Sequence, residues 1–324
     1  VDEEQGTITI SDTGIGMTEA ELITNLGTIA QSGARDFLAV AKESIKQESG
    51  QSNQTDLSLT DLIGQFGVGF YSAFMVAEWV RVVSRSYRLD EKAASWYCTG
   101  ADTFTVQPAE KEARGTDVII KLKEDAQDYA KEHRLRSIIR RHSDFIPFPI
   151  YVGDDQQQVN RQTAIWRQSP REVEEQDYVD FYKQLTLDYE PPMTHAHMVV
   201  DAPVQMYALL YVAGSPERSM FSVRREDGLT LFARKVLIQE YNKDLLPEYL
   251  GFVQGVVDSE DLPRNVSRES VQSNRVMNQR KKLITAKVFD TLSEMAEKEP
   301  EKYIRFWEGY SRQLKQGVAM EQLN

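Results

Sequence analysis

The chain has 324 residues and carries 38 Lys and Arg against 50 Asp and Glu, which gives a net charge of −12. A surface this acidic repels phosphate backbones, so we expect no nucleic-acid partner. Hydrophobic residues make up 41% of the chain, enough for two ordinary cores. Since no apolar run reaches the roughly 18 residues of a membrane-spanning helix, we also expect no membrane partner.

Cysteine and histidine usage limits the kinds of site. The single cysteine, Cys98, excludes an intrachain disulfide, and one Cys with four His disfavours a structural zinc site. Cys98 lies in a β-prone run, so we predict a buried, unreactive thiol. This usage is typical of a reducing compartment.

The first part of the chain alternates strand and helix signals. Residues 7–12 are rich in β-branched side chains and predict a strand. Residues 18–21, Thr-Glu-Ala-Glu, have the spacing of a capping box and predict the start of a helix. The polar residues 47–60 predict a loop, and an apolar helix is predicted over 70–77 behind a glycine-rich segment.

The central part predicts a run of strands and then a helix. The strands are expected at 79–84, 94–99, 103–107 and 116–122. The helix is expected from about 126 to 145, where Pro147 and Pro149 end it. The basic clusters 134–141 and 275–282 are interpreted as solvated helix faces.

A polar segment at residues 153–163 is the predicted linker between two domains, 1–152 and 164–324. The second domain mixes helix and strand, which indicates an α/β architecture. Its predicted elements are a helix at 178–187, extended segments at 197–201 and 205–212, a strand-rich run to about 238, and a long amphipathic helix at 268–297.

Three glycine-containing motifs are candidates for chemistry. Asp12 closes the first predicted strand, where its carboxylate can accept hydrogen bonds from an amine such as that of adenine, and Gly14 and Gly16 permit a sharp turn behind it. The second motif is Gly64-x-x-Gly67-x-Gly69, which opens a predicted helix and can bind an anion through its backbone N–H groups. The third is Arg114-Gly115-Thr116, whose hydroxyl can face a ring nitrogen.

Each motif also has a purely structural interpretation. The pattern at Asp12 describes an ordinary strand-to-helix turn, and the glycines from Gly64 to Gly69 describe a hinge. The second motif lacks the Gly-Lys-Ser/Thr of a P-loop and the βαβ setting of a dinucleotide fingerprint. Single motifs therefore do not decide the function.

Taken in order and spacing, the motifs resemble the Bergerat-type ATP-binding domain. That superfamily includes type II topoisomerases, mismatch-repair ATPases, sensor histidine kinases and the ninety-kilodalton heat-shock chaperones. The strings Asn-Leu-Gly-Thr-Ile-Ala, from Asn25, and Ile-Gly-Gln-Phe-Gly-Val-Gly-Phe-Tyr-Ser, from Ile63, resemble the chaperone branch. Segments of the second half resemble the middle domain of the same chaperones: 165–166, 246–250, 256–263 and 265–269.

The resemblance implies an α/β fold, in which an α+β two-layer sandwich of Bergerat type is followed by an α/β middle domain. It implies that Asp12 binds the adenine amine, that Gly16 and Thr116 complete the adenine contacts, and that Met17 and Phe104 pack against the base. The other implied nucleotide contacts are Asn25 at the ribose and phosphates, Ser32 and Gly33 in a lid, and the phosphate-binding residues Gly64, Gln65, Phe66, Gly67, Val68, Gly69 and Phe70.

Arg268 has a physical argument of its own. It lies in the first turn of a predicted helix, where the helix dipole disfavours a cation. Contact with a bound anion therefore explains an arginine at this position better than simple exposure to solvent does. The resemblance implies that Arg268 reaches the γ-phosphate of ATP like an arginine finger in cis, supported by Asn265 and Gln272. Trp166 fits a core residue and a client-contacting aromatic equally well.

The resemblance implies an ATP-dependent molecular chaperone of bacterial type that binds unfolded client proteins and works as a homodimer. Its cofactors would be ATP and Mg²⁺. The protein would act in the cytoplasm, and an organelle is the alternative location. The family's catalytic Glu, its Mg²⁺-binding Asn and its C-terminal dimerisation domain match nothing between Val1 and Asn324, so we expect little hydrolysis by this chain alone. The alternatives are a non-hydrolysing nucleotide-binding scaffold and another Bergerat-type ATPase.

Overall fold

The computed structural model describes residues 1–27, 69–202, 204–215, 227–260 and 275–321. The chain divides into two compact units. Unit 1 comprises Val1–Ser137 and Val152–Gln156, and unit 2 comprises Ile138–Tyr151 and Gln157–Asn324. The sequence-predicted domain boundaries at residues 152 and 164 stay predictions.

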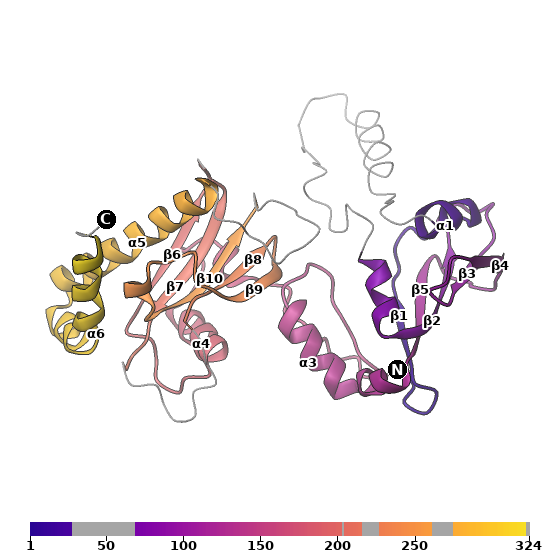
Figure 1. Cartoon of the computed structure of the whole chain (residues 1–324), viewed down its shortest axis with the longest axis horizontal. Helices are drawn as coiled ribbons and strands as arrows, with labels where there is room; N and C mark the ends of the chain where they lie inside the picture. The colour runs from indigo at the N-terminus through magenta and orange to yellow at the C-terminus, as the bar shows by residue number, and fades with distance from the viewer. Residues whose placement is uncertain (28–68, 203, 216–226, 261–274, 322–324) are drawn as a thin grey trace. The chain divides into compact units, whose positions relative to one another are not determined.

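Unit 1 is built on an antiparallel five-stranded sheet (Figure 1). Its strands, in spatial order, are β1 (Thr7–Ser11), β5 (Gly115–Leu122), β2 (Ala77–Arg85), β3 (Ala94–Cys98) and β4 (Phe104–Pro108). All five strands were expected from the sequence and are confirmed. Cys98 is buried at the end of β3, as predicted.

Helices cover the sheet of unit 1 and close its core. The α-helix α1 (Glu19–Leu26) buries Leu22 completely, in the same core as Trp96 of β3 and Leu122 of β5. Among the described residues of unit 1, the remaining helical segments are the 3₁₀ helices η2 (Phe70–Met75) and η3 (Glu124–Ala130) and the α-helix α3 (Glu132–His142). The boundary between the two units falls within α3.

The start of α1 is fixed by the predicted capping box. Thr18 Oγ1 accepts a hydrogen bond from the Glu21 backbone N–H at 3.2 Å, and Glu21 Oε2 accepts one from the Thr18 N–H at 2.8 Å. Two N–H groups that the first turn leaves without helical partners are thereby satisfied. The local sequence alone therefore determines where this helix begins.

Replacing Thr18 by Ala removes the acceptor of this cap. We expect the free energy of unfolding to fall by about 1 kcal/mol in urea titrations, the usual cost of losing a Thr cap. The control is Thr24→Ala at an exposed position of the same helix, which we expect to change stability by less than about 0.5 kcal/mol. Equal losses in the two variants would contradict a specific role for the cap.

Two helix predictions were wrong in their details. The helix expected at 126–145 is interrupted at Lys131, whose extended backbone (φ −82°, ψ 128°) separates η3 from α3. Ala126 and Ala130 are buried in the core, so tertiary packing overrides the helix propensity of this stretch. The helix expected at 70–77 is the 3₁₀ helix η2, which ends before β2 begins.

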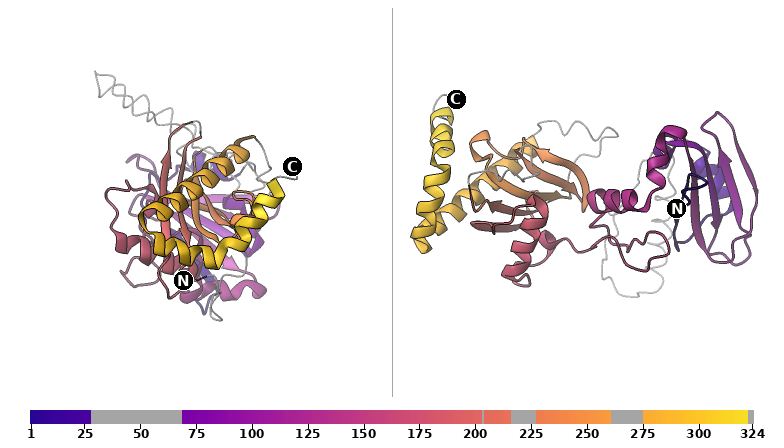
Figure 2. Two further views of the ribbon diagram at one scale, coloured as in Figure 1. Left: turned by 90° about the vertical axis from the view of Figure 1, so that its left-hand side faces the viewer. Right: turned by 90° about the horizontal axis from the view of Figure 1, so that it is seen from below.

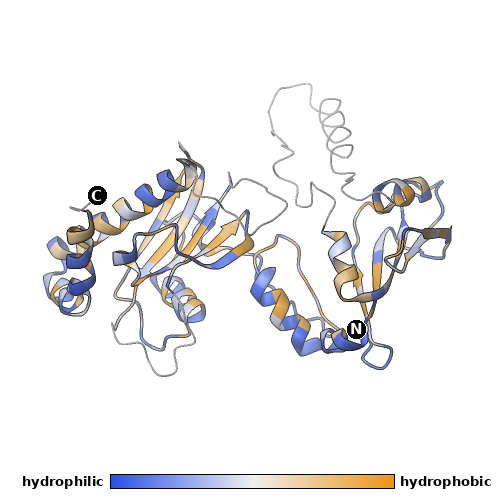
Figure 3. Ribbon diagram, in the orientation of Figure 1, coloured by the Kyte–Doolittle hydropathy of each residue, from blue (hydrophilic) through white to orange (hydrophobic). Residues whose placement is uncertain are grey.

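Unit 2 contains a mixed five-stranded sheet. In spatial order its strands are β6 (Thr194–Val200), β7 (Met206–Val212), β10 (Val253–Ser259), β8 (Leu229–Ala233) and β9 (Val236–Asn242). The β8–β10 pair is parallel and the other pairs are antiparallel. In Figure 3, hydrophobic residues are concentrated along these strands, as expected for a sheet that is buried on both faces.

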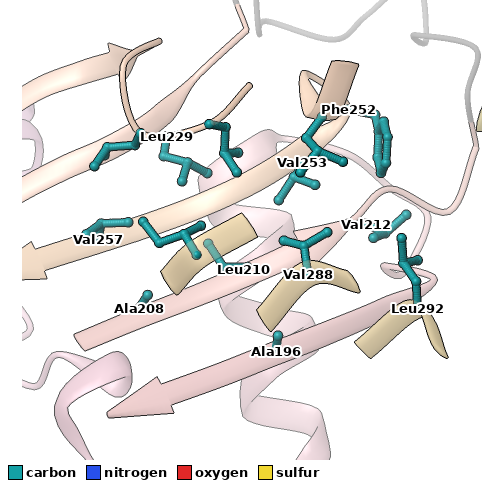
Figure 4. Close-up of a cluster of buried hydrophobic side chains, with 14 of the residues drawn as sticks. Ala196, Ala208, Leu210, Val212, Leu229, Phe252, Val253, Val257, Val288 and Leu292 are labelled. Carbon is teal, nitrogen blue, oxygen red and sulfur yellow. The ribbon is translucent and has the colours of Figure 1, made fainter. Parts of the chain in front are cut away.

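One face of this sheet is covered by α5 (Arg275–Lys298) and α6 (Pro300–Glu321). The left view of Figure 2 shows both helices in front of the sheet. In Figure 4, Val288 and Leu292 of α5 lie over side chains of the sheet such as Ala196 and Val253. This helix pair and the sheet share the largest apolar core of the unit.

The opposite face packs on α4 (Glu175–Thr186) and on the 3₁₀ helix η4 (Ile165–Arg167). Successive residues of β7 alternate between the two faces: Leu210 belongs to the α5 side, whereas Leu209 and Tyr211 belong to the α4 side. A further 3₁₀ helix, η5 (Glu248–Leu250), precedes β10. Helices and sheets in both units confirm the α/β fold class.

Among the described residues, none of the helices combines the length and apolar character that crossing a bilayer requires. The same residues contain no group of three or more His, Cys, Asp or Glu side chains arranged to hold a metal ion.

Candidate functional site

The first and third sequence motifs are joined directly by the backbone of unit 1. The Asp12 N–H donates to the Thr116 carbonyl at 2.9 Å, and the Thr116 N–H donates to the Asp12 carbonyl at 3.3 Å. These bonds continue the β1–β5 ladder, in which Ser11 lies opposite Asp117. Residues that are more than 100 positions apart in the chain therefore meet at one end of β1.

The carboxylate of Asp12 is held in a defined position. Its Oδ1 accepts a hydrogen bond from the Gly14 N–H at 2.8 Å, the geometry of an Asx turn. The side chain is exposed, and in the part of the chain that the structure describes no hydrogen bond occupies Oδ2. The site thus offers an oriented acceptor for a ligand N–H.

Gly16 is required by the turn behind Asp12. Its φ is +64°, and a Cβ at this position would lie 1.8 Å from the Arg85 carbonyl oxygen. The close approach is fixed by a hydrogen bond from the Tyr87 N–H to the Ile15 carbonyl at 2.7 Å. Only glycine lets the turn lie this close to the end of β2.

A buried serine, Ser84 of β2, connects the turn that follows Asp12 with Thr116 of β5; these residues together form the corner at the end of β1. Its Oγ accepts from the Met17 N–H at 2.8 Å and lies 2.9 Å from Thr116 Oγ1, within hydrogen-bond distance. Ser84 is completely buried, and Thr116 is 7% exposed. Sequence analysis missed Ser84, because only the β2–β5 pairing that places Ser84 opposite Thr116 reveals its role.

The remaining described candidates lie around the other end of α1. Asn25 is a half-buried residue of its last turn, and Phe104 of β4 closely approaches Gly27 at its C-cap. Phe104 stacks on Trp96, with ring centroids 5.8 Å apart, and Phe70 meets the same ring edge-on at 5.6 Å. Since α1 has eight residues it is about 12 Å long, and this group lies at its C-terminal end, whereas the turn after Asp12 leads into its N-terminal end. The structure therefore does not bring Phe104 to the turn at Asp12.

Tyr71 ties η2 to α1. Its hydroxyl donates to the Leu26 carbonyl at 2.9 Å. Burial, with a smaller contribution from Cys98, raises the pKa of Tyr71, so the hydroxyl stays protonated and keeps this bond at neutral pH. Gly69, the N-cap of η2, has open space where a Cβ would be.

Many predicted site residues lie outside the described residues, and their roles stay predictions. They are Ser32, Gly33, Gly64, Gln65, Phe66, Gly67 and Val68 of the predicted lid and phosphate segments, and Asn265, Arg268 and Gln272 of the predicted arginine-finger segment.

Trp166 belongs to the core of unit 2. It is completely buried, and its Nε1–H donates to Asp258 Oδ2 at 3.0 Å. Arg167 forms ion pairs with both Asp258 and Glu260 at the end of β10. Burial acts to lower the pKa of Arg167, but the two carboxylates outweigh it and raise that pKa, so this arginine stays charged. Of the two interpretations of Trp166, the structure supports the core residue.

Comparison with known proteins places the chain in a family. The family model described as Hsp90 protein matches residues 152–324. "Chaperone protein HtpG" of Nitratidesulfovibrio vulgaris is 44% identical over 98% of this chain and 49% of its own length. The proteins of the same name from Myxococcus xanthus and Chlorobaculum tepidum are 40% and 41% identical, over 99% and 100% of this chain and 49% and 51% of their own lengths.

These matches confirm the resemblance to the ninety-kilodalton heat-shock chaperones. They also set its extent, because the chain spans about half the length of the curated relatives that it matches. The family model covers more than half of the chain. The chain belongs to the Hsp90 family.

Proposed function

We propose that this chain acts within an ATP-dependent molecular chaperone, and that unit 1 binds the adenine of ATP at the corner formed by Asp12 and Thr116. The observation that carries the proposal is the backbone pairing of these two residues beside the Gly16 turn. The relatives named Chaperone protein HtpG, at 40–44% identity over nearly the whole chain, support the chaperone role.

The corner has the chemistry that adenine recognition needs. Oδ2 of Asp12 can accept from the exocyclic amine, while Oδ1 stays with Gly14. Ser84 Oγ already accepts from the Met17 N–H, and its own proton has two acceptors within reach, Thr116 Oγ1 at 2.9 Å and the Gly115 carbonyl at 3.3 Å. Adenine recognition requires that this proton goes to the nearer acceptor, Thr116 Oγ1. The Thr116 proton then points elsewhere, toward a ring nitrogen or a bridging water.

The finer parts of the proposal rest on the family resemblance. Unit 1 would have the Bergerat-type fold, with Met17 and Phe104 against the base and Asn25 toward the ribose. The 64–70 segment would bind the phosphates, and Arg268 would reach the γ-phosphate, with Asn265 and Gln272 in support. Mg²⁺ would neutralise phosphate charge, but the described residues contain no cluster of ligands that fits it.

The intact chaperone would close a lid over ATP, dimerise and hold unfolded client proteins in the cytoplasm. Helix α1, about 12 Å long, supports part of this layout, since the turn after Asp12 leads into its first residues and Asn25 lies in its last turn, toward the phosphates. Phe104 lies near the C-cap Gly27 and not beside Asp12, so its predicted contact with the base is the part that the helix length does not support. ATP binding without turnover in the full-length protein would instead favour the nucleotide-binding scaffold.

Replacing Asp12 by Asn in the full-length protein tests the adenine assignment. The amide presents donors where the adenine amine also donates, and a mispaired polar group costs about 1–3 kcal/mol, so we expect a roughly 5- to 150-fold weaker ATP affinity by isothermal titration calorimetry.

The matched control is Asp102→Asn. It makes the same chemical change on an exposed loop between β3 and β4, and we expect it to leave ATP affinity unchanged. Wild-type affinity in the Asp12 variant, with intact secondary structure by circular dichroism, would refute the adenine assignment.

A further inference from the structure

Unit 2 contains a cavity of about 420 Å³ that no part of the proposed function uses. It lies among the last turn of α3, the C-terminal part of α4 and the strands β8, β9 and β10, and all of its lining residues belong to unit 2. Its volume falls in the range of small-molecule sites, about 300–1,000 Å³.

Much of the lining is apolar, and part of it is aromatic. Phe145 and Phe232 meet edge to face with ring centroids 5.8 Å apart, and Phe181 of α4 and Val256 of β10 continue the same surface. A planar ring can pack against such edges and faces with specific geometry. The shape and polarity of this lining therefore favour an aromatic ligand.

The rim of the cavity has an excess of positive charge. Arg141 is neutralised by Glu240, with N–O distances of 2.6 and 2.7 Å, and Arg161 by Asp144 at 3.2 Å. Arg140 also lines the cavity; it contributes to the field at Asp144 but forms no ion pair among the described residues. Three guanidinium groups against two carboxylates leave one positive charge at the rim, which favours an anionic ligand.

One polar group of the lining lacks a hydrogen bond. Gln254 of β10 lines the cavity, and its Oε1 is buried with no donor in the part of the chain that the structure describes. A buried acceptor without a partner costs free energy, which a ligand N–H or O–H can recover. Gln254 Oε1 therefore favours a ligand that carries a hydrogen-bond donor.

We propose that this cavity binds a small aromatic organic anion that carries an N–H or O–H donor. The ring packs against Phe145 and Phe232, the acid group faces Arg140, and the donor reaches the amide of Gln254. The site goes beyond the proposed nucleotide function and does not depend on it, because none of these residues belongs to unit 1.

NMR titrations of the whole chain with three probes of similar size separate the contribution of the ligand's negative charge from that of its N–H donor. Indoleacetate is an aromatic anion with an N–H donor, indoleacetamide lacks the charge, and naphthaleneacetate lacks the ring N–H. We expect indoleacetate to bind one-to-one and about five-fold more tightly than indoleacetamide, the usual limit for a partly exposed ion pair. We expect naphthaleneacetate to bind roughly 2- to 10-fold more weakly than indoleacetate.

Variants assign each preference to a residue. Arg140→Ala should abolish the preference for the anion, and Gln254→Leu should abolish the preference for the N–H donor. Thr230→Trp places a bulky ring in the cavity and should abolish binding of all three probes. The control, Arg305→Ala, removes the same charge from an exposed position of α6 in the same unit and should leave binding at the wild-type level.

Arg140 is exposed, so its replacement leaves the fold intact and keeps the test decisive even if Thr230→Trp fails to fold. The proposal is overturned if indoleacetate does not bind, or if Arg140→Ala retains the wild-type preference for indoleacetate over indoleacetamide.

Discussion

Replacing Asp258 by Ala is expected to lower the free energy of unfolding of unit 2 by about 3–5 kcal/mol, the usual cost of breaking a buried ion pair from one side. Asp258 is completely buried. It accepts hydrogen bonds from Trp166 Nε1 at 3.0 Å, from the Arg167 guanidinium and from the Lys235 N–H at 3.2 Å. The Ala variant leaves the half-buried Arg167 with Glu260 as its remaining carboxylate partner.

The same carboxylate supports a strained turn. Arg234 and Lys235 connect β8 to β9, and both have positive φ, 51° and 66°. This is the backbone of a type I′ hairpin turn, which non-glycine residues adopt at a cost. Because Asp258 accepts from the Lys235 N–H, its removal weakens the hairpin as well as the ion pair.

Urea unfolding followed by tryptophan fluorescence measures this loss. Asp290→Ala, at an exposed position of α5, is the control and should change stability by less than about 0.5 kcal/mol. Adding Arg167→Met to the Asp258 variant should recover part of the loss, since the double variant no longer contains a half-buried guanidinium group that has lost one of its two carboxylate partners. A loss below about 1 kcal/mol for Asp258→Ala would contradict the importance of this network.

Replacing Gly16 by Ala is expected to destabilise unit 1 by about 2–4 kcal/mol, the combined cost of a left-handed non-glycine residue and of overpacking. The new Cβ would lie 1.8 Å from the Arg85 carbonyl, which is backbone and cannot turn away. Moving the turn also moves Met17 away from Ser84, so we expect the ATP affinity of the full-length protein to fall together with stability.

Gly69→Ala is the matched control, because nothing lies within 4 Å of a Cβ at that position and its φ is −60°. We expect urea unfolding of this variant to resemble the wild type. If Gly16→Ala were as stable as Gly69→Ala, the close approach of the turn to β2 would not be a constraint on the fold.

Local signals predicted much of the fold. The capping box at Thr18 predicted the first residue of α1, a β-branched run predicted β1, and the other four strands of unit 1 were also expected from their local sequence, because these features depend on neighbouring residues in the chain. The strand β10 and the helix α6 were not predicted. Both depend on the context of unit 2, where β10 pairs with β7 and β8, and α6 packs on α5 and η5.

Charged residues show the limit of sequence patterns most clearly. The cluster 275–282 was interpreted as a solvated helix face, yet Arg280 is completely buried and donates to Ser259 Oγ at 2.6 Å. Helical periodicity cannot identify this partner, because Ser259 is brought to α5 by the end of β10. The interpretation of Arg280 was therefore wrong.

The candidate site was predictable in part. Asp12, Gly16, Met17 and Thr116 were singled out from the sequence, and the structure brings them to one corner of unit 1. Ser84, which joins them, carries no sequence signal, since its role comes from strand pairing. The roles of the phosphate segment and of Arg268 stay predictions, because those residues lie outside the described part of the chain.

The most direct test of the adenine site compares ATP with inosine triphosphate, whose base has a carbonyl in place of the exocyclic amine. Calorimetry on the full-length protein should show wild type preferring ATP roughly 5- to 150-fold, because the carbonyl would face the Asp12 carboxylate. In Asp12→Asn that preference should disappear, because the amide can donate to the carbonyl. Equal affinities for the two nucleotides in wild type, or an unchanged preference in Asp12→Asn, would contradict adenine recognition by Asp12.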